Sequence, residues 1–238
     1  MVREHDIIAL ARYCKANLGL AGAALSDEYY YQSVPLCVID AIFSLGALYA
    51  STRNTVRRFC EHFGLQVIRN PLRNLPPPPS RQLSVTEFLR LYEKYTVNEM
   101  AKKVYKNSQR TSTRNGILKS EAVLLFAKTL LNFDVDYLQD MGKVLEKESF
   151  EKEIAEISGQ RSGISTKYFY MLAGSDNHIK FDRWVDRFVH AAIDESLSIE
   201  DGVRAVKGAH IILMRDYPEL TPRALDHLIW SHQRELEG

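Results

Sequence analysis

Hydrophobic residues recur at helical spacing along almost the whole chain. Val56, Phe59, Cys60 and Phe63 fall on one face of a helix with 3.6 residues per turn, and Gly64 is placed to end that helix. No segment keeps the strict apolar–polar alternation of a half-buried strand. The pattern therefore predicts an all-α fold class.

The same pattern gives the extent of each predicted helix. Residues 35–48 are apolar nearly all round, which is typical of a helix buried on every side, and Pro35 fits its first turn. Ser84 or Thr86 before Glu87 is a capping signature that opens a helix reaching residue 105. Further helices are predicted near the N-terminus and over residues 52–63, 118–133, 148–158, 166–174, 182–196, 199–215 and 221–236.

Two segments interrupt the helical pattern. Four prolines, Pro76–Pro79, lie within LRNLPPPPSRQ, where they forbid a helix and favour an extended surface loop. Residues 111–116, TSTRNG, are polar and contain a glycine, so they are predicted to form a loop. We find no internal repeat.

Composition narrows the class of protein. The 238 residues are 45% hydrophobic and 26% charged, which allows one large globular domain or two small ones. No apolar run reaches the roughly 18 residues that span a bilayer, and the N-terminus is a poor signal peptide. The three cysteines lack a CxxC pair, which argues against a disulfide framework and against an iron–sulfur or zinc site. We expect a cytoplasmic protein without metal or cofactor and without a membrane partner.

Positive charge is unevenly distributed, although the net charge is only +1. Residues 102–119 carry six lysines and arginines and no acid, and Arg53, Arg57 and Arg58 form a second cluster. A solvated face is the plain interpretation of each. The alternative is a polarised surface that meets nucleic-acid phosphates.

The segment 158–174, SGQRSGISTKYFYMLAG, predicts a turn between two helices. Gly163 permits a left-handed backbone or a close approach by a ligand. The helix that starts near Thr166 would present unpaired N–H groups and partial positive charge, which together bind phosphate. Lys167 adds a charge at that end. The plain alternative is a polar bend in a helical hairpin.

Within this segment, RSGISTK resembles the hairpin of the helix-hairpin-helix DNA glycosylase superfamily, whose pattern is roughly hydrophobic-Pro-Gly-hydrophobic-Gly-x-Lys. Gly163, Ile164 and Lys167 match the first glycine, the apolar residue and the lysine. Ser165 replaces the second glycine, and an Arg-Ser pair at 161–162 replaces the hydrophobic-Pro pair.

Three further elements follow the order of that superfamily. FDRWVDRF resembles its catalytic segment, with Asp182 in the place of the catalytic aspartate, 15 residues after Lys167 and slightly closer than is usual. Lys119 and Glu121 resemble its Lys-Ala-Glu helix start. CVIDAIFSLGALY resembles its apolar helix as far as Ser44, after which the usual glutamines are replaced. The four elements span about residues 36–190, and the cysteines of the iron–sulfur members are absent.

The resemblance implies a two-lobed helical fold with a cleft between the lobes, formed by residues 36–181 and by residues 1–35 with 182–238. It implies a monomer that flips a damaged or modified base out of double-stranded DNA and cleaves its N-glycosidic bond. Asp182 would stabilise the positive charge at C1′, and Lys167 would either attack as a Schiff-base amine or contact a phosphate. The implied DNA contacts are Arg161, Ser162, Gly163, Ile164, Ser165, Thr166 and Lys180, and the implied base-pocket residues are Asp40, Tyr49, Tyr168, Tyr170 and Trp184.

Several alternatives stay open at this point. Asp182 is also a favoured helix N-cap, and Asp40 could pair with an arginine rather than accept from an exocyclic amino group. His178 and Lys180 could be plain surface residues. The chain could be a non-catalytic helix-hairpin-helix module that binds the DNA backbone, or a helical interaction protein without nucleic acid. Within the enzyme hypothesis, repair of host DNA and attack on modified foreign DNA are equally compatible, as are monofunctional and lyase activities.

Overall fold

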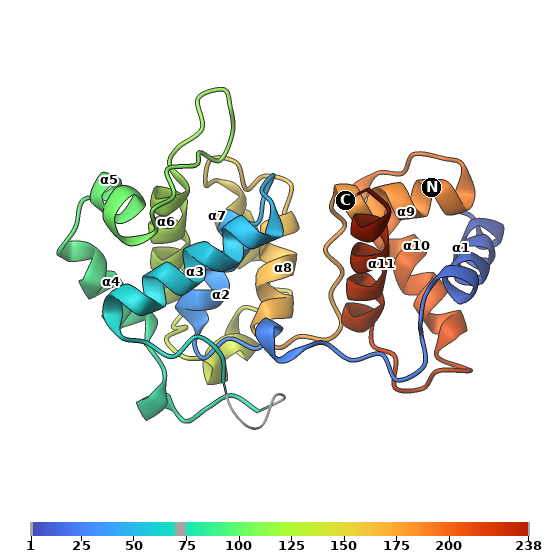
Figure 1. Ribbon diagram of the computed structural model, residues 1–238, viewed down its shortest axis with the longest axis horizontal. Coiled ribbons are helices and arrows are strands. Elements are labelled where there is room, and N and C mark those ends of the chain that lie inside the picture. Colours follow the sequence, from blue (N-terminus) through green and yellow to red (C-terminus); the bar gives the residue numbers. More distant parts are fainter. Residues whose placement is uncertain (1, 70–74, 238) are drawn as a thin grey trace. The chain divides into compact units, whose positions relative to one another are not determined.

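The computed structural model describes residues 2–69 and 75–237, and their backbone is helical (Figure 1). This part of the chain contains two isolated β-bridges and no strand, so the predicted all-α fold class is confirmed for it. The chain divides into two compact units, residues 27–174 and residues 1–26 with 175–238. The lobe boundaries implied by the resemblance, 36–181 and 1–35 with 182–238, stay a prediction.

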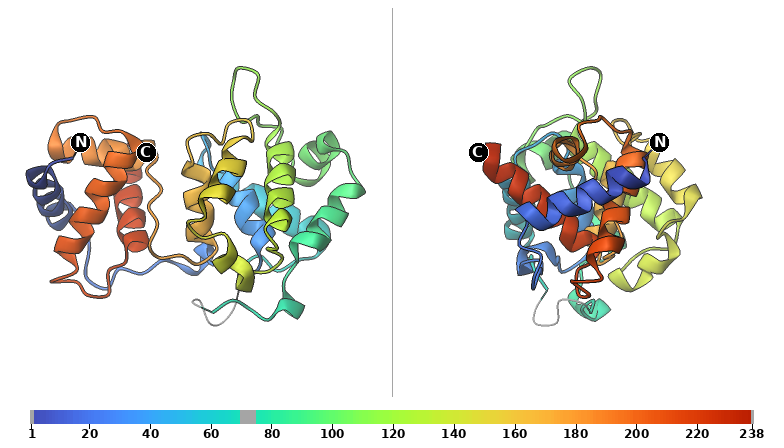
Figure 2. Two further views of the ribbon diagram at one scale, coloured as in Figure 1. Left: turned by 180° about the vertical axis from the view of Figure 1, so that it is seen from behind. Right: turned by 90° about the vertical axis from the view of Figure 1, so that its right-hand side faces the viewer.

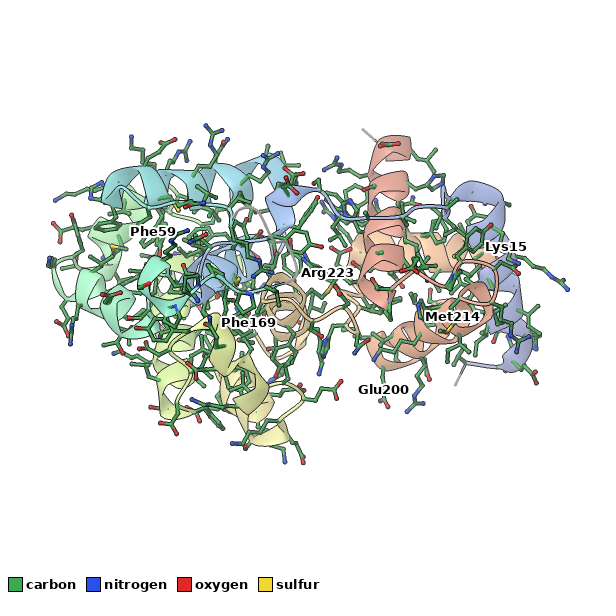
Figure 3. The ribbon with its side chains drawn as sticks, turned by 90° about the horizontal axis from the view of Figure 1, so that it is seen from below. Lys15, Phe59, Phe169, Glu200, Met214 and Arg223 are labelled. Atoms are coloured by element: carbon green, nitrogen blue, oxygen red, sulfur yellow. The ribbon has the colours of Figure 1, made fainter. Side chains whose placement is uncertain are left out.

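The unit of residues 27–174 is built around one fully buried helix, α2 (Val34–Phe43). Every residue of α2 is buried, as the all-round apolar pattern predicts, and α3, α6 and α8 pack against it. Figure 3 shows Phe59 and Phe169, from two of these helices, among the side chains inside the unit. The helices around α2 are α3 (Tyr49–Phe63), α4 (Val85–Glu93), α5 (Val97–Glu99), α6 (Lys119–Asn132), α7 (Glu148–Ala155) and α8 (Ile164–Leu172).

Helix α2 ends at Phe43, earlier than the predicted residue 48, because a buried lysine from α6 holds its C-terminal end. Lys119 Nζ donates to Phe43 O at 3.0 Å and to Leu45 O at 2.7 Å, and it also bonds Gln109 Oε1 at 3.1 Å. A cation at this position satisfies carbonyls that lack a helical partner and complements the helix dipole. Gly46 then turns the chain with a φ of 63°.

Other predicted boundaries are wrong as well, including the start of α3, which is Tyr49 rather than residue 52, and the end of α7, which is Ala155 rather than residue 158. The helix predicted over 84–105 is broken at 94–96, because Thr96 and Glu99 form a second capping box that starts α5, followed by a π-helical stretch at Met100–Val104. Helix α8 begins at Ile164 rather than near Thr166, directly after the left-handed Gly163. Pro79 begins a single 3₁₀ turn that ends at Arg81. Residues 72–74, the start of the LRNLPPPPSRQ break, lie outside the described residues.

The second unit consists of α1 (Glu4–Asn17), α9 (Arg183–Ile193), α10 (Ile199–Leu213) and α11 (Pro222–Glu237) (Figure 2). Helix α1 packs mainly on α10, and α9 packs mainly on α11. Each helix presents an apolar face to the others, with Leu10, Phe188, Val206 and Leu225 among the buried side chains. In the part of the chain that the structure describes, no helix is long and apolar enough to cross a membrane.

We predict that Lys119→Met lowers the free energy of unfolding by about 2–4 kcal/mol, because methionine fills the volume but leaves buried carbonyls without their donor. Urea unfolding measures the loss. Lys128→Met, an exposed position on the same helix, is the matched control and should change stability by about 0.5 kcal/mol or less. Equal unfolding midpoints for the two variants would show that the Lys119 contacts do not hold the end of α2.

Candidate functional site

The turn between α7 and α8 leaves the first amides of α8 open. Gly163 is the N-cap, with a φ of 71°, and Ile164 N–H is 3.4 Å from Ser162 Oγ. The first backbone bond of the helix runs from Lys167 N–H to Gly163 O, at 3.0 Å. Within the described residues, the N–H groups of Ser165 and Thr166 have no hydrogen-bond acceptor. Such a helix start can bind an anion.

The side chains of this turn divide into an inner and an outer set. Ser165 and Thr166 are buried, and Ser165 Oγ donates to Gln160 Oε1 at 2.5 Å. Arg161 and Ser162 are exposed. A phosphate at this place would therefore meet backbone groups and the Arg161 guanidinium, but not the Ser165 hydroxyl that replaces the second glycine of the superfamily pattern.

Lys167 already has a partner in the same unit. Its Nζ lies 2.6 Å from Glu151 Oε1 of α7 and 5.6 Å from the centre of the Tyr170 ring. An ammonium paired with a carboxylate has no lone pair with which to attack a sugar. A covalent role for Lys167 would require Glu151 to release it.

A polar loop stands beside this turn. Residues 107–118 form a loop that protrudes from the unit in Figures 1 and 2, and a β-bridge joins Arg110 and Leu118 at its base. Gly159 of the hairpin packs so closely on Thr111 that an added Cβ would lie 2.6 Å from Thr111 Cβ. The loop and the hairpin are therefore neighbours on one end of the unit.

The two basic stretches seen in the sequence also meet here. Arg58 of α3 donates through Nη1 to Lys106 O at 3.2 Å, and Asn107 Nδ2 donates to Thr55 Oγ1 at 3.0 Å. Lys102, Lys106 and Arg114 are exposed. We call Lys102, Lys106, Arg114 and the exposed Arg161 the basic surface of the 27–174 unit.

The predicted pocket acid Asp40 lies inside α2, bonded to a tyrosine that the sequence did not single out. Tyr31 Oη donates to Asp40 Oδ2 at 2.7 Å, and both side chains are buried. Burial, and after it the charge of Asp40 and the proximity of Tyr168, raise the pKa of Tyr31 well above its usual value. The structure thus brings Asp40 and Tyr168 together through Tyr31.

The other predicted pocket aromatics take different positions. Tyr170 is buried in the core, where its hydroxyl donates to Val144 O at 2.9 Å. Tyr49 stacks on Tyr29 with ring centres 6.1 Å apart, and burial raises the pKa of Tyr49. Trp184 belongs to the other unit. A role in base binding stays a prediction for all of them.

Asp182 is the N-cap of α9, and its position is set by the segment 175–182. Its Oδ1 accepts from Trp184 N–H at 2.9 Å and from Val185 N–H at 3.4 Å. Its Oδ2 lies 3.8 Å from Lys180 Nζ, and the side chains of Asp182 and Lys180 are 19% and 12% exposed. The N-cap interpretation of Asp182 is therefore confirmed, while its catalytic role stays a prediction.

The backbone before Asp182 makes a tight turn that is anchored to two helices. Asp182 N–H donates to Lys180 O at 2.7 Å, which closes the turn around Phe181. The Phe181 ring packs on Gly202 of α10, where an added Cβ would lie only 2.1 Å from it. Lys180 N–H donates to Asp226 Oδ1 of α11 at 2.8 Å. These contacts fix where the Asp182 carboxylate points.

The start of the segment is held to α11 as well. Arg223, labelled in Figure 3, is buried; its N–H donates to Asp176 O at 3.0 Å and its Nη1 lies 3.5 Å from Asp176 Oδ1. His178 is also buried, with Nδ1 2.6 Å from Ser175 Oγ, so it is not the plain surface residue that was one alternative.

Sequence reasoning missed Arg223, Asp226, Glu151 and Tyr31. A single acid one turn after an arginine, inside the apolar pattern of the last helix, was the available signal for Asp226 and Arg223. No local signal identifies Glu151 or Tyr31, since their partners come from other elements. In the described ranges, no group of three or more histidines, cysteines or acids could hold a metal ion.

Comparison with known proteins identifies one family. The model of a domain of unknown function, DUF8548, matches residues 8–234, and the chain belongs to that family. No curated protein matches the chain, and no solved structure matches it.

We predict that Gly202→Ala lowers the free energy of unfolding by about 1–3 kcal/mol and displaces the turn around Phe181, because the new methyl group overlaps a buried ring. Amide chemical shifts of residues 180–184 report the displacement. Gly19→Ala is the matched control in the same unit, because no atom lies within 4 Å of the added Cβ. Unchanged shifts and stability in Gly202→Ala would mean that Phe181 does not anchor the turn.

Proposed function

We propose that this member of the DUF8548 family is a DNA glycosylase, which excises a damaged or modified base after flipping it out of double-stranded DNA. The observation that carries the proposal is Asp182. It is a partly exposed carboxylate held by two backbone N–H groups and by a turn anchored to α10 and α11. The proposal includes the two-lobed fold of the helix-hairpin-helix glycosylases and a monomeric, cytoplasmic enzyme without a cofactor.

The chemistry needs a fixed negative charge beside the sugar. When the N-glycosidic bond breaks, positive charge develops at C1′, and a preorganised carboxylate stabilises it and can orient the attacking nucleophile. In Asp182, Oδ1 is occupied by the cap, so Oδ2 is the oxygen that would face the sugar. The ammonium of Lys180 lies 3.8 Å from this oxygen.

The hairpin and the basic surface support DNA as the partner. The open amides of Ser165 and Thr166 suit one phosphate oxygen, and Arg161 lies next to them. Exposed positive charge is also present at Arg114 in the neighbouring loop and at Lys102 and Lys106, which precede that loop. Phosphate contacts of this kind fix the register of a protein on the duplex and carry no base specificity.

The role proposed for Lys167 depends on whether its ion pair with Glu151 persists when DNA binds. The Glu151 pair favours a structural or phosphate-neutralising ammonium, so hydrolysis by water is the simpler course. Lyase activity through a Schiff base would require DNA to displace Glu151. Repair of host DNA and attack on modified foreign DNA both remain within the proposal.

A non-catalytic module that binds the DNA backbone is the second candidate function. One observation favours it: the cap bonds to Trp184 and Val185 give Asp182 a structural role that needs no chemistry. The two candidates differ in the consequence of neutralising Asp182, since a module would keep its DNA affinity and never release a base.

We predict that the wild-type protein releases a free base from a pool of duplexes carrying damaged or hypermodified bases, detected by mass spectrometry. Asp182→Asn should reduce release by at least about 100-fold, because asparagine keeps the cap but removes the charge. Asp186→Asn, in the first turn of the same helix, is the matched control and should retain activity. Release by Asp182→Asn at the wild-type rate would exclude Asp182 as the catalytic group, and no release from any duplex would favour the module.

We predict that the basic surface sets the salt dependence of DNA binding. Replacing Lys102, Lys106 and Arg114 together by glutamine should reduce the slope of log K against log salt concentration by roughly 2–3, since each phosphate contact contributes about 0.9. Fluorescence anisotropy with a labelled duplex measures this slope. The control replaces Arg12, Lys207 and Arg215 of the other unit, which removes the same charge. Equal slopes for the two triple variants would show that the basic surface does not contact DNA phosphates.

A further inference from the structure

A second carboxylate lies directly behind the turn that carries Asp182. Asp226 is 5% exposed, and its Oδ1 accepts the N–H of Lys180 at 2.8 Å. The side chain of the same lysine reaches to within 3.8 Å of Asp182 Oδ2. One residue, Lys180, therefore links two aspartates from different helices, through its backbone on one side and its ammonium on the other.

Both acidic and basic side chains face Asp226. Asp182 at the start of α9 and Lys180 in the preceding segment face it, together with Arg223 one turn earlier on its own helix. Arg223 is shared with Asp176, 3.5 Å away, and the half-buried His210 of α10 bonds Leu220 O at 2.7 Å. Burial first, and then the charge of Asp182, raise the pKa of Asp226 well above its usual value.

We propose that Asp226 is the positioning residue of the candidate site: its buried side chain accepts the Lys180 N–H and so holds the turn that brings the Lys180 ammonium beside Asp182. Its link to base excision rests on the proposed function, but the contacts and the proton state of Asp226 do not. Ionisation of Asp226 would place a second negative charge behind Asp182 and draw the Lys180 ammonium away from it.

The sign of the pH effect follows from the raised pKa. Above the ordinary aspartate value of about 3.9, the unfolded chain has lost this proton while the folded chain keeps it. Stability from this group therefore falls as pH rises, until the folded protein also loses the proton. Asp226→Asn keeps the acceptor oxygen and cannot ionise, so its stability should lack this fall. The difference amounts to a tenfold change in the unfolding constant per pH unit within that window.

The direct test follows the carboxyl carbon of Asp226 by ¹³C NMR as a function of pH, in the full-length wild-type protein and in Asp182→Asn. We expect Asp226 to titrate well above the range of exposed aspartates, and its midpoint to fall when the charge of Asp182 is removed. A second readout is the amide chemical shift of Trp184. In wild type it should change with the same pH midpoint as the Asp226 carboxyl carbon, and this change should be absent in Asp226→Asn. Titration in the ordinary range, or a midpoint that Asp182→Asn leaves unchanged, would overturn the proposal.

These outcomes are separate from the fate of the glycosylase proposal. If no duplex yields a base, the NMR titration still decides whether Asp226 is neutral and coupled to Asp182. If a base is released, Asp226→Asn should keep release at low pH and extend it to higher pH than wild type. If Asp226 were only structural, the pH profiles of base release by wild type and by Asp226→Asn would be parallel. If Asp226→Asn does not fold, the comparison of wild type with Asp182→Asn remains decisive.

Discussion

The tight turn around Phe181 is the constraint on which the candidate site depends. Three contacts hold it: the bond from Asp182 N–H to Lys180 O, the bond from Lys180 N–H to Asp226, and the packing of the Phe181 ring on Gly202. They reach helices α10 and α11 as well as the start of α9. A carboxylate supported in this way has little freedom to reorient, which is the requirement for electrostatic stabilisation of a developing charge.

The two units use buried charge differently. In the 27–174 unit, Lys119 donates to carbonyl oxygens at the end of α2 and to a side-chain amide oxygen, and Asp40 accepts from the Tyr31 hydroxyl. In the second unit, Asp176, Lys180, Asp182, Arg223 and Asp226 follow the segment 175–182 and the start of α11. These polar side chains therefore gather along the segment that carries Asp182, where Arg223 and Asp226 are buried and Lys180 and Asp182 are largely buried.

Periodicity predicted the helices because it reflects burial, which acts along a single element. It identified the all-round burial of α2, while the N-cap preference of aspartate provided the cap of α9 by Asp182 as one of two alternatives. It failed at residues 94–96, where the capping box of Thr96 and Glu99 outweighed a continuous apolar pattern. Periodicity could not predict the partners of the site residues, because these partners are distant in sequence: Asp226 is 46 residues from Lys180, and Glu151 is 16 residues from Lys167. The resemblance drew attention to the hairpin and to Asp182, but only the structure separates the buried Ser165 from the exposed Arg161.

The most direct test of the central claim avoids the unknown base. A duplex that carries a cationic pyrrolidine ring in place of one deoxyribose imitates the positive charge of the excision transition state, and a neutral tetrahydrofuran ring is its matched reference. Transition-state mimics bind more tightly than neutral analogues when an enzyme stabilises the developing charge. The account predicts that wild type prefers the cationic duplex by at least about tenfold, or roughly 1.4 kcal/mol, and that Asp182→Asn loses this preference. Equal affinity of the wild-type protein for the two duplexes would contradict the claim that Asp182 is a catalytic carboxylate.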